Sequence, residues 1–93
     1  MTTSFFKAAL TEINNMHVAI IWLDNYYMNK EEEIKKQVAF FKTLLDCPNI
    51  VVMILDENEK PVYFGKREII ELLKQHVWKK FPWQSYELNT KRE

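Results

Sequence analysis

The sequence contains two uninterrupted apolar runs of six residues, Val18–Leu23 (VAIIWL) and Ile50–Leu55 (IVVMIL). Both runs are rich in β-branched side chains and apolar at both alternating sets of positions, a pattern typical of strands covered on both faces. Both are far shorter than the roughly 20 apolar residues that a membrane-spanning helix requires. We therefore expect two buried strands and no membrane partner.

A helix is predicted between these two strands. Its apolar residues recur at helical spacing: Ile34, Val38, Phe41 and Leu45. Asn29 and Glu32 have the spacing of an N-cap residue and its acidic partner, so the helix should begin there. Pro48 prevents its continuation, which places the helix end at about Asp46. Two strands joined by such a crossover helix should be parallel.

A hairpin is predicted after the second strand. The polar residues 56–60 form the expected turn, and Val62–Phe64 forms a short strand that should pair antiparallel with Ile50–Leu55. Pro61 opens that strand, where a missing N–H group costs the fewest ladder bonds.

Two further helices are predicted from apolar residues at helical spacing. The first covers Phe6–Ile13 and ends at the Asn14-Asn15 pair, and the last covers Lys66–Lys80 and ends before Pro82. The expected fold is therefore a small α/β three-layer sandwich with the element order α-β-α-β-β-α.

Alternating polarity over Trp83–Leu88 indicates an additional C-terminal edge strand. With 93 residues, the chain should form one compact domain over residues 1–88, followed by a frayed polar tail over residues 89–93. The 13 basic and 13 acidic residues cancel, which removes the electrostatic attraction that nucleic-acid binders use. The lone Cys47 and the absence of signal-peptide features predict a reducing, cytoplasmic setting.

The expected arrangement from Phe5 to about Val77 resembles a thioredoxin-like domain that lacks one strand-helix unit. The first apolar run matches the central strand of that family, and the hairpin matches the one before its last helix. Where the family has its Cys-x-x-Cys motif, this chain has Tyr27–Glu31 (YMNKE). The resemblance therefore implies the fold without dithiol chemistry.

Cys47 is the candidate for thiol chemistry. It precedes Pro48, which falls near the cis-proline of the thioredoxin-like family and leaves a cis Cys47–Pro48 bond open. Asp46 and the negative end of the preceding helix both disfavour the thiolate form, which opposes reactivity. We favour a structural cysteine, and a monothiol redox protein is the alternative function.

Asp24 and Asp56 each follow an apolar run, so they should lie at the same edge of the sheet, where open α/β sheets bind ligands. Together with Glu57 they could supply oxygen ligands to Mg²⁺. Asp is also an ordinary turn residue after a strand, and we favour that interpretation. No metal or other cofactor is expected.

Large aromatic and apolar residues provide the candidate binding surfaces: Tyr26, Tyr27 and Met28 in one loop, and Trp78, Phe81, Trp83 and Tyr86 near the C-terminus. The C-terminal rings could form a small second core or a protein interface. Together with the neighbouring lysines they could also stack single-stranded bases, an alternative that the neutral charge of the chain disfavours. We predict a non-enzymatic protein-binding or regulatory module whose partner is another protein, including a second copy in a homodimer.

Overall fold

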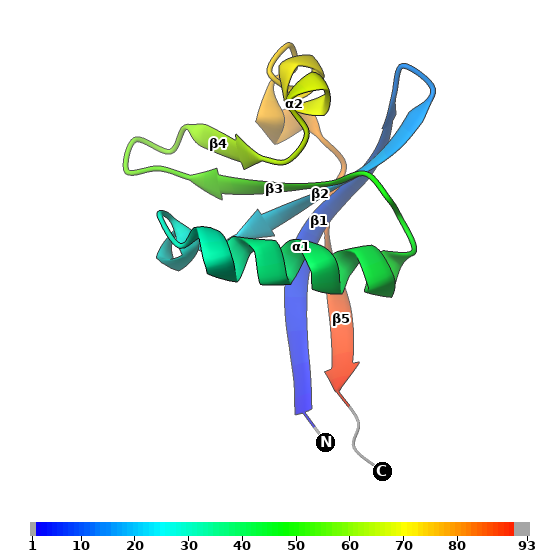
Figure 1. Ribbon diagram of the computed structural model, residues 1–93, viewed down its shortest axis with the longest axis vertical. Helices are drawn as coiled ribbons and strands as arrows, with labels where there is room; N and C mark the ends of the chain where they lie inside the picture. Colours follow the sequence, from blue (N-terminus) through cyan, green and yellow to red (C-terminus); the bar gives the residue numbers. More distant parts are fainter. Residues whose placement is uncertain (1, 91–93) are drawn as a thin grey trace.

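The computed structural model describes the backbone of residues 2–90 and the side chains of residues 5–87. The fold is a five-stranded sheet with the order β4-β3-β2-β1-β5, against which the helices pack (Figure 1). The elements in chain order are β1 (Thr2–Ile13), β2 (Met16–Leu23), η1 (Asn25–Tyr27), α1 (Glu31–Leu45), β3 (Ile50–Leu55), β4 (Pro61–Phe64), α2 (Arg67–Leu73), η2 (Trp78–Lys80) and β5 (Trp83–Thr90).

The centre of the sheet agrees with the sequence patterns. Strands β2 and β3 are parallel, from Ala19 beside Ile50 to Leu23 beside Ile54, and α1 is the crossover between them. Strands β3 and β4 form the expected antiparallel hairpin. The α/β class is therefore confirmed.

The predicted N-terminal helix is wrong, because residues 2–13 form strand β1. The Asn14-Asn15 pair is a two-residue hairpin turn and not a helix end: φ is 51° at Asn14 and 63° at Asn15. Two consecutive residues with positive φ characterise the turn that best matches the twist of paired strands, and Asn tolerates this conformation. Strand β1 consequently pairs antiparallel with β2, and the expected order α-β-α-β-β-α is replaced by β-β-η-α-β-β-α-η-β.

The last predicted helix is shorter than expected. Helix α2 ends at Leu73 instead of continuing to Lys80, and Val77 is exposed. Beyond the helix, the chain turns so that Trp78 and Trp83 pack against Trp22 of β2. Burying these rings stabilises more than another exposed helical turn would.

The predicted C-terminal strand is confirmed. Strand β5 pairs antiparallel with β1, from Trp83 beside Ala9 to Thr90 beside Thr2. Residues 89 and 90 of the expected tail belong to this strand, and residues 91–93 lie outside the described residues.

The start of α1 differs from the expected cap. Lys30 is the N-cap residue and makes no side-chain capping bond, whereas Asn29 precedes it with φ 68°. The predicted N-cap at Asn29 is wrong because this residue provides the left-handed turn that leads from η1 into the helix. The end of α1 at Leu45, followed by Asp46 in a left-handed conformation, agrees with the prediction.

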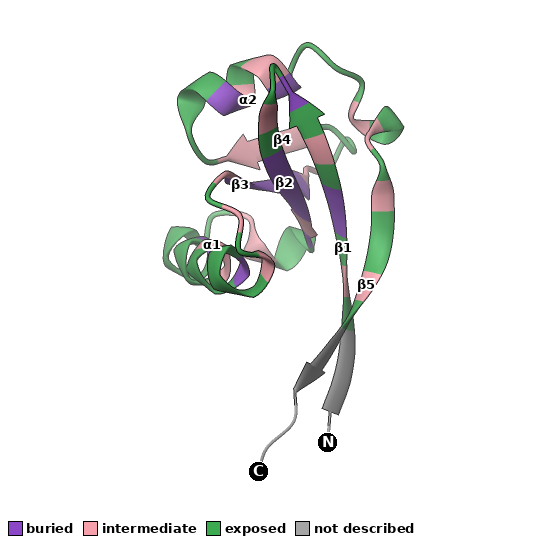
Figure 2. Ribbon diagram, turned by 90° about the vertical axis from the view of Figure 1, so that its right-hand side faces the viewer, coloured by how far each residue is buried: buried purple, intermediate pink, exposed green. Residues whose placement is uncertain are grey.

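The sheet separates two cores (Figure 2). On one face, Ile34 and Phe41 of α1 pack with Ala8, Ile21 and Val52 of the sheet. The second core lies on the opposite face, beneath α2: Ala9, Val18, Ile20, Met53, Ile69 and Leu73. The alternation within one strand explains why β2 is apolar at every position from Val18 to Leu23. Within residues 2–90, neither helix is long and apolar enough to cross a membrane.

Candidate functional site

The C-terminal aromatic residues mostly complete the cores. Trp78 and Trp83 are half-buried, and each ring centroid lies 5.3 Å from that of Trp22. The indole Nε1 of Trp83 donates a 2.7 Å hydrogen bond to the carbonyl oxygen of Trp78. Phe81 packs with these rings in the core under α2. Tyr86 lies on the opposite face of the sheet, where it stacks on Phe6. This geometry corresponds to the small second core that the sequence left open.

The loop Tyr26–Met28 is divided between core and surface. The side chains of Tyr27 and Met28 pack against the core under α1. Tyr26 is 65% exposed, and Lys30 Nζ lies 4.8 Å from the centre of its ring. Tyr26 is therefore the loop residue that remains most available for a partner.

Asp24 and Asp56 stabilise the turns that follow β2 and β3 by hydrogen bonds to the backbone. Asp24 accepts a 2.8 Å hydrogen bond from the backbone N–H of Tyr26. Asp56 accepts two, from the backbone N–H groups of Asn58 at 2.8 Å and Lys60 at 2.9 Å. Among the described residues, no group of three or more His, Cys, Asp or Glu side chains is placed to hold a metal ion.

Cys47 is half-buried between the end of α1 and the start of β3. Its Sγ lies 3.8 Å from the carbonyl oxygen of His17 and 3.7 Å from that of Asn49. The peptide bond to Pro48 is trans, because no cis peptide bond occurs in the described residues. These contacts tie Cys47 to the backbone near β2.

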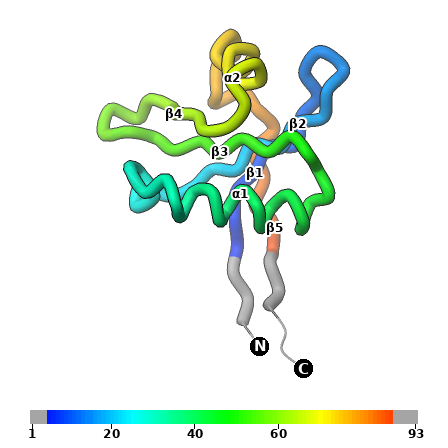
Figure 3. Tube along the Cα trace, viewed as in Figure 1, coloured from blue at the N-terminus to red at the C-terminus, as the bar shows by residue number. Residues whose placement is uncertain are grey.

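The most open aromatic surface lies where β1 continues past the end of β2. Strand β1 pairs with β2 only from Lys7 onward, so residues 2–6 have β5 as their only strand neighbour in the described part of the chain. Helix α1 crosses β1 in the view of Figure 3, and Phe5 and Phe6 of β1 line one pocket with Phe40 of α1. Between them lies a groove of about 610 Å³, which we call the aromatic groove; its lining includes Phe5, Lys7, Asp24, Tyr27, Gln37 and Phe40.

Two rings of the aromatic groove are unusually exposed for their size. The side chain of Phe5 is 70% exposed and that of Phe40 is 44% exposed. The neighbouring Phe6 also lines the groove but is half-buried, and its ring faces α1, 4.9 Å from that of Phe41. The sequence patterns missed Phe5 because they assigned this segment to a helix, whereas alternation in a strand separates Phe5 from Phe6.

No protein-family model matches the chain, and no curated protein or solved structure shows significant similarity to it. The resemblance to thioredoxin-like domains therefore stays a prediction. The candidate site depends on geometry alone, and its distinguishing features are the open side of β1 and the exposed rings beside it.

Proposed function

We propose that the protein is a non-enzymatic protein-binding module and that an extended segment of its partner lies in the aromatic groove. The observation that carries this proposal is that residues 2–6 of β1 have no described strand on the β2 side, next to the exposed ring of Phe5. An exposed strand edge binds an extended peptide through main-chain hydrogen bonds, and the surfaces beside it select the side chains.

The chemistry of the groove indicates what the partner segment contains. Phe5 and Phe40 are large rings that gain from being covered, and aromatic residues dominate the energetics of protein interfaces. The groove has one cationic and one anionic residue, Lys7 and Asp24. A segment with large apolar side chains and little net charge fits this surface best.

Selection from a library of ten-residue peptides tests the proposal. Fluorescence anisotropy should show that Phe5→Ser and Phe40→Ser each weaken binding of the selected peptides by about tenfold or more, as expected for hot-spot rings. The matched control is Leu10→Ser, which removes another exposed apolar side chain of β1 outside the groove. Failure to select any peptide, or equal weakening by all three variants, would contradict the proposal.

A second copy of the chain is the other partner that a specific observation favours. The two sheet edges differ: β4 has four residues and begins with Pro61, whereas β5 has eight residues, no proline or lysine, and Glu87 as its one charged residue. Short strands, proline and lysine are the devices that protect edges from pairing, and β5 lacks them. We propose homodimerisation through β5, which a strictly monomeric mass by light scattering at millimolar concentration would exclude.

A further inference from the structure

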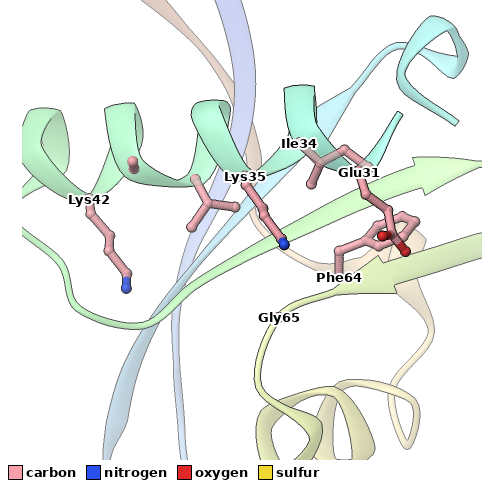
Figure 4. A pocket seen from close by; sticks show the side chains of 8 residues that line it. Glu31, Ile34, Lys35, Lys42, Phe64 and Gly65 are labelled. Carbon is pink, nitrogen blue, oxygen red and sulfur yellow. The ribbon is translucent and has the colours of Figure 1, made fainter. Parts of the chain in front are cut away.

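A second groove lies at the opposite edge of the sheet, between α1 and the end of β4 (Figure 4). Its volume is about 490 Å³, within the range of roughly 300–1,000 Å³ that is usual for small-molecule sites. We call it the α1–β4 groove. It shares no lining residue with the aromatic groove, and a ligand here is independent of the proposed protein partner.

The interior of the α1–β4 groove is apolar. Ile34 is only 4% exposed, and Val38 and Phe64 are half-buried against the same core. The small side chain of Ala39 and the absence of one at Gly65 leave the groove open to solvent. An apolar chain placed here would cover these surfaces and be favoured by the hydrophobic effect.

The charges on the groove are arranged along α1. Lys35 and Lys42 extend from the helix in the same direction (Figure 4), seven residues apart, which corresponds to about 10 Å of helix. Glu31 lies at the other end of the groove, at the first residue of α1. The groove therefore has an acidic end and a basic part.

Neither groove lysine has a carboxylate partner in the described residues. The ion pair found there joins Lys36 to Glu33 at 3.7 Å, and neither of these two residues lines the groove. A ligand with a negative head group would gain the attraction of Lys35 and Lys42 without having to displace a protein carboxylate.

We propose that the α1–β4 groove binds a monocarboxylate with an unbranched apolar tail. The carboxylate lies near Lys35 and Lys42, and the tail covers Ile34, Val38 and Phe64. Glu31 disfavours a second negative charge at the far end, which selects against dicarboxylates. Glu31 and Lys42 are eleven positions apart, which corresponds to about 16 Å of helix, so the groove suits a chain of medium length.

A peptide strand fits this groove less well. Strand β4 has four residues, and Pro61 at its start has no N–H group to donate. Few main-chain bonds are thus available to an added strand at this edge. A small amphiphile needs no such bonds.

Titration of the ¹⁵N-labelled 93-residue chain with dodecanoate, below its micelle concentration, tests the proposal. We expect saturable amide shifts at groove positions such as Val38, Ala39 and Gly65. Dodecyltrimethylammonium has a tail of the same length with a positive head, and it should bind at least fivefold more weakly. Equal affinity for the two probes, or no shift at these positions up to solubility, would overturn the proposal.

Charge variants test the role of the lysines. Lys35→Gln and Lys42→Gln should each weaken dodecanoate binding about two- to fivefold, in keeping with exposed ion pairs, and the effect should shrink at high salt. Lys36→Gln removes the same charge outside the groove and should leave the affinity unchanged. Ala39→Trp should fill the groove and abolish binding in a folded protein. An equal effect of Lys36→Gln would show non-specific attraction and reject the site.

Discussion

Tyr63 carries a buried hydroxyl group that has no hydrogen-bond partner among the described residues. Its ring packs in the core under α2, where it contributes apolar contacts. Because an unsatisfied buried hydroxyl opposes folding, Tyr63→Phe should raise the free energy of unfolding by up to about 1 kcal/mol. Urea denaturation measures this change, and Tyr26→Phe, at an exposed ring, should leave it unaltered. A loss of stability in Tyr63→Phe would show that the hydroxyl has a favourable contact.

The same residue makes stability depend on alkaline pH. Burial raises the pKa of the Tyr63 hydroxyl above its ordinary value of 10.0. Above a pH of about 10, the unfolded chain releases this proton more readily than the folded protein does. The free energy of unfolding therefore decreases as the pH rises further. The stability of Tyr63→Phe relative to the wild type should therefore increase between pH 9 and pH 11.5, as measured by urea denaturation. A constant difference would contradict the assignment.

Among the elements, the β1–β2 hairpin depends on its two-residue turn. Asn15 has φ 63°, a conformation that costs most L-residues about 1 kcal/mol or more and glycine very little. Asn15→Ala should therefore lower the free energy of unfolding by about 1 kcal/mol, and Asn15→Gly should maintain or raise it. Thermal denaturation of the two variants measures these opposite changes in stability. Asn58→Ala, at a turn residue whose own φ is not positive, is the control, and equal losses in both Asn15 variants would contradict the turn assignment.

Elements with strong local patterns could be predicted from the sequence. The β2 and β3 strands are continuous apolar runs, and α1 has a long stripe of apolar residues with a proline beyond its end. Strand β1 could not, because its spacing of apolar residues also fits a helix and its conformation is set by pairing with β2 and β5. The early end of α2 likewise depends on distant contacts with Trp22.

At the scale of the whole molecule, the aromatic groove brings together residues that are far apart in the chain. Tyr27 lines it and belongs to the loop that the sequence identified as a candidate binding surface. Phe5 and Phe40 come from β1 and α1, and the sequence identified neither as a candidate binding residue. The groove exists because β1 continues beyond β2, and this difference in strand length has no local signature in the sequence.

The free edge of β5 is compatible with pairing to a second copy around a two-fold axis. If the axis passes through Ser85 or Tyr86, antiparallel pairing places Glu87 opposite Trp83 or Ser85 and brings no like charges together. The zero net charge also adds no overall repulsion between two copies. The expected dimer would join two five-stranded sheets into one.

Lysines on the β5 edge should prevent this dimer. Gln84 and Ser85 are exposed, so Gln84→Lys combined with Ser85→Lys should preserve the fold while placing four lysines near the two-fold axis. Sedimentation equilibrium should then show a dissociation constant raised at least tenfold, and less so at high salt. Thr43→Lys combined with Gln75→Lys adds the same charge at exposed positions away from β5 and should leave dimerisation intact. Equal weakening in both double variants would attribute the effect to net charge and reject β5 as the interface.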